Sequence, residues 1–183
     1  GVLLIFDEVI TGFRVHPGGA QGNYGIRPDL TTMAKIVAGG LPGGCVGGRA
    51  DVLQFLEFSQ QPNRKMPHPG TFNANPLSAA AGITTLRIVA TGEPNRRANE
   101  TGQTLRAKLN ALFAAEGVAW VVYGDFSGFK ILTGYSGPRP SASDVAESDP
   151  FVPYNGDFDR LDAKADPKLK QAFRQAMLLN GVD

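Results

Sequence analysis

Two charged residues lie in surroundings that could support chemistry. Asp7 follows the apolar run Val2–Phe6, at the predicted carboxyl end of a strand, which is where open α/β sheets bind ligands. Lys35 precedes a glycine-rich segment and is the only charged residue between Asp29 and Arg49. Such surroundings can desolvate a lysine, which lowers the pKa of its amine and makes it a nucleophile. The pair suggests pyridoxal phosphate, with the lysine forming a Schiff base and the aspartate holding the pyridinium proton.

Both residues also have ordinary structural explanations, and other functions stay open. A lysine before a glycine loop is often simply exposed, and an aspartate at a strand end is often a turn or cap residue. The segment Val2–Glu8 also has the apolar-strand-plus-Asp-Glu form found in nucleotide-hydrolysing modules, although the chain lacks the phosphate loop G-x-x-x-x-G-K-[ST]. A third alternative is a non-catalytic binding scaffold, against which the presence of both Asp7 and Lys35 argues.

The elements that must position these residues can be predicted from local patterns. The run Val2–Phe6 is apolar on both faces, as is typical of a strand inside a parallel sheet. Residues 12–29 are rich in Gly and Pro and are predicted as a loop with one short helical turn. Beyond them we predict a strand at 30–34, tight backbone at 39–48, a helix at 49–58 and a polar loop at 59–75.

The second part of the chain contains clear helix starts. Asn75 and Pro76 suit the N-cap and first position of a helix, and the Ala-rich segment 77–90 should be largely buried. Pro94 begins a second helix, which Gly117 ends. We further predict strands at 118–123 and 129–133, a long loop at 134–165, and a last helix that starts at Asp166-Pro167 and ends near Asn180-Gly181.

Composition limits the partners and the compartment. Among the 183 residues, 18 basic and 17 acidic side chains give a formal charge of +1, which offers no electrostatic reason to expect nucleic acid or a membrane as partner. The single cysteine excludes an internal disulfide framework and fits a reducing compartment, so we expect a cytoplasmic protein. No apolar run approaches the roughly 20 residues of a membrane span. The two histidines lack metal-ligand spacing, so we expect no metal site.

Three ordered motifs resemble those of the class III aminotransferases, a family that depends on pyridoxal phosphate. The segment LIFDEVITGFR at 4–14 is similar to the family's aspartate motif. The segment PDLTTMAK at 28–35, followed by GGLPGG at 39–44, is similar to its lysine motif. The segment GTFNANPL at 70–77 is similar to its third signature. Three motifs in the family's order make the resemblance specific.

The resemblance implies a fold and a reaction. The fold would be α/β, part of the fold type I of pyridoxal-phosphate-dependent transferases. Residues 1–90 would form the C-terminal half of the cofactor-binding large domain, and residues 91–183 would form part of a smaller, C-terminal α+β domain. The reaction would be amino-group transfer on a small amino substrate. Ile10 stands where many transaminases of the family carry glutamine, which favours the branch that contains the glutamate-1-semialdehyde 2,1-aminomutases. A transaminase that uses a separate oxo acid is the alternative.

The matched motif positions imply the site residues. Lys35 would form the Schiff base with the cofactor and shuttle the proton during catalysis. Asp7 would pair with the pyridinium nitrogen, and Val9 would pack against one face of the ring. Thr71 would bind the cofactor phosphate of the neighbouring subunit, which makes a homodimer the expected assembly.

Two further expectations concern the chain as a whole and a neighbour of Asp7. The chain opens on an apolar strand without a methionine, so we expect a piece of a longer protein that lacks the family's amino-terminal phosphate cup. Residues 1–183 alone should therefore be inactive.

Glu8 and Arg14 form either an ion pair near the site or a purely structural contact, and the structural role is favoured.

Overall fold

The computed structural model describes residues 1–58, 64–140, 151–162 and 165–182. The chain forms two compact units, Gly1–Asn99 and Glu100–Asp183. The division falls inside the long helix α4, which spans Glu93–Ala115. The assignment of a cofactor-binding domain and a smaller domain to the two parts of the chain remains a prediction.

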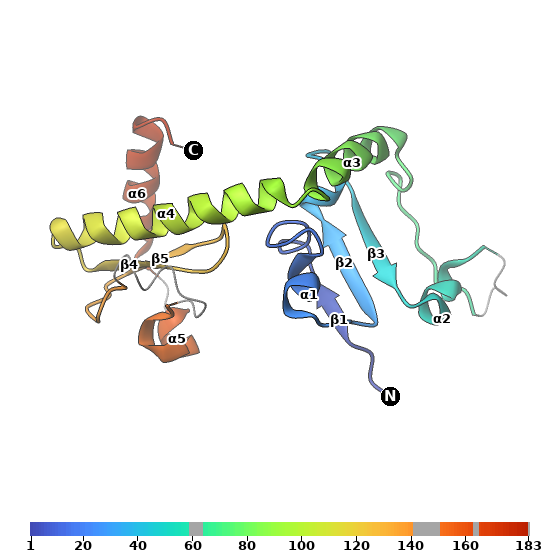
Figure 1. The fold of residues 1–183 in the computed structure, drawn as a ribbon, viewed down its shortest axis with the longest axis horizontal. Coiled ribbons are helices and arrows are strands. Elements are labelled where there is room, and N and C mark those ends of the chain that lie inside the picture. Colours follow the sequence, from blue (N-terminus) through green and yellow to red (C-terminus); the bar gives the residue numbers. More distant parts are fainter. Residues whose placement is uncertain (59–63, 141–150, 163–164, 183) are drawn as a thin grey trace. The chain divides into compact units, whose positions relative to one another are not determined.

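A three-stranded sheet forms the frame of the first unit (Figure 1). Its strands lie in the order β1 (Ile5–Asp7), β2 (Leu30–Ala34) and β3 (Gly44–Gly48). Strands β1 and β2 are parallel, whereas β2 and β3 are antiparallel. The predicted strand at 30–34 is confirmed. The strand predicted at 2–6 forms only at Ile5–Asp7, and Val2–Ile5 are exposed, so the expectation of a strand covered on both faces is not met in this chain.

The third strand was not expected from its sequence, because glycine has a low strand propensity. Antiparallel pairing with β2 makes the glycine-rich segment extended, with Gly48 opposite Leu30 and Gly44 opposite Ala34. A Cβ atom at Gly48 would collide with the carbonyl oxygen of Asp29. The close approach of the two backbones therefore requires glycine at this position.

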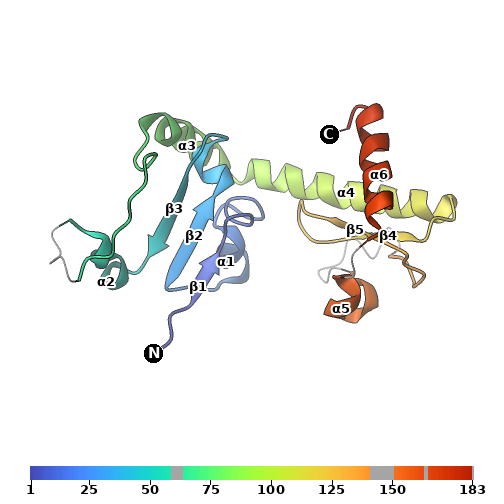
Figure 2. The ribbon, with the colours of Figure 1, turned by 180° about the vertical axis from the view of Figure 1, so that it is seen from behind.

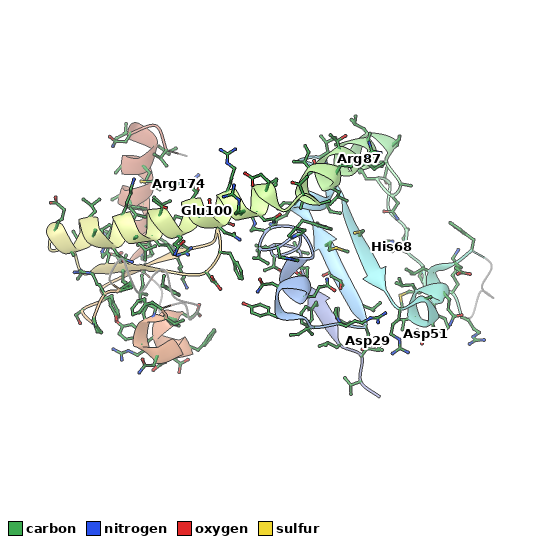
Figure 3. The ribbon with its side chains drawn as sticks, in the orientation of Figure 1. Asp29, Asp51, His68, Arg87, Glu100 and Arg174 are labelled. Atoms are coloured by element: carbon green, nitrogen blue, oxygen red, sulfur yellow. The ribbon has the colours of Figure 1, made fainter. Side chains whose placement is uncertain are left out.

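Charged side chains bind the sheet together at the end where β1 and β2 begin. The Asp29 carboxylate accepts a hydrogen bond from the Leu4 amide through Oδ2 (2.8 Å) and pairs with Arg49 Nη1 through Oδ1 (2.8 Å). Arg49 also pairs with Asp51. The hydrogen bond from Arg49 is the main reason that the pKa of Asp29 lies below its ordinary value. Figure 3 shows Asp29 and Asp51 at the opposite end of the sheet from Arg87, which lies on α3.

Short helices follow strands β1 and β3. Helix α1 (Gly19–Tyr24) is the helical turn predicted within 12–29, and both views show it beside β1 (Figure 1 and Figure 2). The helix predicted at 49–58 is broken into α2 (Ala50–Leu53) and a 3₁₀ turn, η2 (Gln54–Leu56). The predicted loop at 59–75 is only partly described, since residues 59–63 lie outside the described part of the chain.

Helix α3 (Pro76–Val89) begins as its sequence predicts. The Asn75 side chain caps it by accepting from the Leu77 and Ser78 amides, at 3.0 and 3.1 Å. The expectation that this helix is largely buried is wrong for this chain, because only Gly82 and Val89 are buried on it. The helix packs mainly against the short 3₁₀ turn that follows β2, and Leu77, Ile83 and Ile88 stay exposed.

The second unit is built on a hairpin. Strands β4 (Trp120–Tyr123) and β5 (Lys130–Thr133) pair antiparallel, as predicted, and their core is Val121, Leu132 and Tyr135. Helix α6 (Pro167–Leu179) begins with Asp166 as its cap, also as predicted. The predicted loop at 134–165 contains the 3₁₀ turn η4 (Pro153–Gly156) and the short helix α5 (Phe158–Leu161), while residues 141–150 and 163–164 lie outside the described part.

The side chain of Asn110 joins α4 to the hairpin from a fully buried position. Its amide donates to the Val122 carbonyl (2.9 Å) and accepts from the Val122 amide (2.8 Å). Removing both bonds by Asn110→Ala leaves two buried backbone groups without partners, so we expect the free energy of unfolding to fall by about 2–3 kcal/mol. Urea denaturation measures the change. The matched control Asn180→Ala, which removes one bond at the exposed end of α6, should cost less than about 1 kcal/mol. Equal losses in both variants would contradict the buried role of Asn110.

No helix in the described part of the chain combines the length and the apolar character that crossing a membrane requires.

Candidate active site

Asp7 and Lys35 lie at the same edge of the sheet. Asp7 is the last residue of β1 and is opposite Thr32 of the parallel strand β2. Lys35 directly follows Ala34, the last residue of β2. Because the carboxyl ends of neighbouring parallel strands meet at one edge, this arrangement brings an acid and an amine to the position where open α/β sheets bind ligands.

The Asp7 carboxylate is partly engaged and partly free. Its Oδ1 atom accepts from the Val9 amide at 3.0 Å and from the Thr32 hydroxyl at 3.4 Å. Within the described part of the chain, Oδ2 has no hydrogen-bond partner, and the residue is exposed. Asp7 therefore acts as a turn cap, as its ordinary structural explanation states. One carboxylate oxygen is still available to a ligand.

Lys35 holds an unusual backbone conformation. Its φ of 53° lies in the left-handed region, where a non-glycine residue is disfavoured by roughly 1–2 kcal/mol. Strained residues of this kind concentrate at functional sites. The expectation of a desolvated lysine is not met in this chain, because Lys35 is exposed. The glycine segment that follows it continues into β3, which pairs with β2.

The turn that carries Lys35 is seated directly on α3. This turn, η1 (Lys35–Ala38), ends at Gly39, which has a φ of 63°. A Cβ atom at Gly82 of α3 would lie 2.5 Å from the Val37 carbonyl oxygen, and a Cβ at Gly39 would lie 2.6 Å from the Ala81 carbonyl oxygen. Both glycines permit a backbone contact that any side chain would prevent. The close contact sets the distance between the backbone of the lysine turn and that of α3.

Thr71, the third predicted site residue, lies elsewhere in the first unit. It is exposed, in a turn in which the Asn73 amide donates to the Gly70 carbonyl (3.0 Å). The same segment carries His68, labelled in Figure 3, and it runs from η2 to α3. No described contact joins Thr71 to Asp7 or Lys35. The structure thus places Asp7, Val9 and Lys35 at or beside one edge of the sheet and Thr71 in a separate turn before α3.

A cavity of about 500 Å³ lies beside the turn that contains Thr71. It opens between the start of β3 and the first turn of α3. Its walls come from three short stretches of chain, which are Val37–Ala38, Pro42–Gly44 and Phe72–Asn75, together with His68, Ser78 and Ala79. Thr71 is adjacent to this wall, and a group bound in the cavity would lie close to the glycine-rich segment.

Sequence reasoning did not predict the contacts that Glu8 makes. Glu8 is 1% exposed, and its carboxylate accepts from the Thr11 hydroxyl (2.5 Å), the Ala20 amide (2.9 Å) and the Gln21 amide (2.8 Å). These contacts support the structural role favoured for it. The two glycines at the start of α1, Gly18 and Gly19, were the available signal, because the N-terminus of a helix favours a nearby acid.

These hydrogen bonds also set the charge state of Glu8. Burial by itself raises the pKa of the carboxyl, but the donors from Gln21, Thr11 and Ala20 outweigh burial and hold the pKa below its ordinary value. A lowered pKa in the folded state means that ionised Glu8 adds stability above its ordinary pKa. That stability is lost as the pH falls through the lower folded value.

The side chains of two asparagines hold the loop that follows Glu8. Asn95 Nδ2 donates to the carbonyls of Phe13 and Arg14, both at 2.8 Å, and Asn99 Nδ2 donates to Val15 at 3.1 Å. The two asparagines therefore hold three consecutive carbonyls of this loop. In the described residues, no group of three His, Cys, Asp or Glu side chains is placed to hold a metal ion.

Comparison with known proteins identifies the family. The sequence model of the family described as Aminotransferase class-III matches residues 1–125, and the chain belongs to this family. The glutamate-1-semialdehyde 2,1-aminomutase of Pyrobaculum islandicum is 43% identical over 149 residues, which cover 81% of this chain and 34% of that protein. The corresponding enzyme of Pyrobaculum aerophilum is 54% identical over 105 residues, or 57% of this chain and 24% of that protein.

Solved structures confirm the predicted fold class. An omega-transaminase from Sphaerobacter thermophilus has a TM-score of 0.66 and 41% identity, over 79% of this chain and 32% of that one. A beta-phenylalanine aminotransferase from Variovorax paradoxus has a TM-score of 0.65 and 41% identity, over 81% and 34%. The chain has part of the α/β fold type I of pyridoxal-phosphate-dependent transferases. It spans about a third or less of the length of the relatives it matches.

Proposed function

We propose that this chain supplies the lysine and the aspartate of a pyridoxal-phosphate-dependent enzyme that transfers amino groups. The observation that carries the proposal is the placement of Asp7 and Lys35 at one edge of two parallel strands, with Lys35 in a strained conformation. Membership of the class III aminotransferase family supports it. The family match favours amino-group transfer over the nucleotide-hydrolysing alternative.

The side chains present fit this cofactor. Pyridoxal phosphate, when bound, supplies an electron sink for the carbanion that forms on the substrate. The free oxygen of Asp7 would hold the proton on the ring nitrogen, and the cap to Val9 and Thr32 would keep the carboxylate in place. The exposed amine of Lys35 would hold the cofactor covalently, and its Nζ atom would move the proton at the substrate carbon.

Val9 and Thr71 complete the proposed cofactor site. Val9 follows Asp7 by two residues and is partly exposed, which suits a side chain that packs against one face of the ring. Thr71 would bind the cofactor phosphate of the neighbouring subunit in a homodimer. Its exposure leaves the hydroxyl available to a group outside this chain. The remaining parts of the proposal are a small-molecule amino substrate and a cytoplasmic location.

We prefer the aminomutase reaction, and the transaminase reaction is the second candidate. The curated relatives of highest similarity reported above are aminomutases, whereas the two solved structures at 41% identity are transaminases. Ile10 is 60% exposed beside the site, so an apolar residue is presented where an amide would otherwise be available. An aminomutase needs no separate acceptor, because it returns the amino group to the same carbon skeleton.

Turnover assays test this proposal on the full-length protein with pyridoxal phosphate. One assay supplies glutamate-1-semialdehyde alone, and the other supplies a panel of amine donors with a separate oxo acid. Conversion of the first substrate without an acceptor supports the aminomutase reaction, and conversion that requires the oxo acid supports the transaminase. Absence of turnover in both assays would contradict amino-group transfer.

Thr71→Val tests the phosphate contact. A hydrogen bond to a charged group is worth roughly 1.5–3 kcal/mol, so the Kd for pyridoxal phosphate should rise by at least about tenfold. The rate at saturating cofactor should change much less, because a phosphate contact positions the cofactor without reacting. Fluorescence titration measures the Kd. Thr84→Val, an exposed replacement of the same type on α3, is the control. An unchanged Kd for Thr71→Val would refute the phosphate role.

A further inference from the structure

Glu8 is the most buried carboxylate in the described part of the chain, and the proposed chemistry does not use it. Every polar group of this residue is bonded. Its amide donates to the Thr32 carbonyl of β2 (2.9 Å), and its own carbonyl accepts from the Gly12 amide (2.9 Å). Its carboxylate accepts from Thr11, Ala20 and Gln21. Glu8 therefore connects the end of the sheet to the whole loop that returns to β2.

The contacts around Glu8 leave little freedom to rearrange. A Cβ atom at Gly19 would lie 2.7 Å from both carboxylate oxygens and would displace them, and the φ of 67° at this position also favours glycine. Gly12 is under a similar restriction, since a Cβ atom there would lie 2.6 Å from the Glu8 carbonyl oxygen. The Gln21 amide side chain then reaches the buried Thr31 hydroxyl of β2 at 3.3 Å. A continuous set of hydrogen bonds thus runs from Glu8 to β2, the strand that directly precedes Lys35.

The two neighbours of Glu8 are the residues proposed to touch the cofactor. Asp7 precedes it, and Val9 follows it. The Val9 amide is one of the two donors that hold the Asp7 carboxylate. The direction of that amide depends on the backbone of Glu8, which the carboxylate contacts fix from the loop side. A side chain that points away from the cofactor edge can in this way set the position of both neighbours.

We infer that Glu8 is a positioning residue, whose buried carboxylate holds Asp7 and Val9 in the geometry that cofactor binding requires. The effect on cofactor binding rests on the proposed function, whereas the hold of Glu8 on its neighbours rests on the geometry alone. Glu8→Gln replaces one acceptor oxygen by an amide nitrogen that faces backbone donors. Thr11→Val removes a single donor and keeps the shape of the side chain, so it should give a smaller change of the same kind. Glu116→Gln, at an exposed position after α4, is the matched control.

Two measurements on the full-length protein test the inference. The first is hydrogen–deuterium exchange of the cofactor-free protein, in which Glu8→Gln should speed exchange in the peptides that cover 8–22 and leave those of α6 unchanged. The second is the Kd for pyridoxal phosphate, together with the visible circular dichroism of the bound cofactor. The Kd should rise roughly tenfold or more in Glu8→Gln, and by less in Thr11→Val. The dichroic band should change because the ring orientation changes.

The outcomes separate this inference from the proposed function. Normal Kd and normal dichroism in Glu8→Gln, with a lower free energy of unfolding, would show a merely structural residue and overturn the inference. Unchanged exchange at 8–22 would also overturn it. If wild-type protein fails to retain pyridoxal phosphate while Glu8→Gln still loosens 8–22, the proposed function is refuted and the role of Glu8 in holding the loop is supported.

Discussion

Lys35→Ala should lower turnover by more than about 10⁴-fold, which exceeds the usual contribution of one acid–base group because a covalent role is lost as well. The full-length variant should also lose the visible absorption that the lysine-bound cofactor gives. Steady-state kinetics and absorption spectra measure both effects. Lys108→Ala, at an exposed position on α4, should behave as wild type. Turnover within tenfold of wild type in Lys35→Ala would show that another group carries the chemistry.

The strained backbone of Lys35 gives a second observable at the same position. Glycine adopts a φ of 53° without the Cβ penalty, so Lys35→Gly should unfold with a free energy about 1 kcal/mol higher than Lys35→Ala. Both variants should be equally inactive. If the glycine variant is the more stable one, the chain carries a lysine at a position where glycine would stabilise the fold. A functional requirement for the lysine explains that choice. Equal stability of the two variants would show that the backbone relaxes on substitution.

Asp7→Asn should lower kcat by roughly 10²- to 10³-fold, the cost of removing one electrostatic contact to a charge that develops in the reaction. Asparagine keeps the oxygen that accepts from Val9 and Thr32, so the loop and cofactor binding should persist. The negative charge that holds the ring proton is lost, and the cofactor becomes a poorer electron sink.

The comparison for Asp7→Asn uses Asp159→Asn, an exposed change of the same type on α5. Steady-state kinetics at saturating pyridoxal phosphate give kcat for both variants, and a titration gives the Kd of the cofactor. A near-normal kcat in Asp7→Asn would mean that this carboxylate is only the turn cap seen in its hydrogen bonds.

Local signals predicted the parts of the fold that depend on local chemistry. Asn75-Pro76 and Asp166-Pro167 each place a capping oxygen before a proline, and both start helices where the sequence places them. The β4–β5 hairpin followed from alternation of apolar residues. These signals need only neighbours within a few residues.

The failures depend on contacts that a local pattern does not contain. Strand β3 forms because β2 offers a partner, although its own sequence is mostly glycine. The apolar composition of α3 predicts a buried helix, but it does not show whether other residues cover it. In this chain Ile83 and Ile88 remain exposed. The desolvation expected for Lys35 likewise depends on covering residues that a local pattern does not show, and Lys35 is exposed.

The candidate site was predicted in part. Asp7 and Lys35 were identified from their isolation among apolar and glycine residues, and the strand register places them at one edge. The part played by Glu8 was not predicted, because two of its three donors, the amides of Ala20 and Gln21, lie 12 and 13 positions further along the chain. Only the folded loop brings those amides to the acid.

The most direct test of the central claim is to trap the cofactor on its lysine. Borohydride reduces the bond between a lysine amine and pyridoxal phosphate to a stable secondary amine, which also blocks trypsin at that residue. Full-length protein treated in this way should give a labelled tryptic peptide that runs from 15 to 49, since the Arg27–Pro28 bond also resists trypsin. The account predicts that mass spectrometry places the label on Lys35. A label on any other lysine, or no label on protein that retains the cofactor, would contradict it.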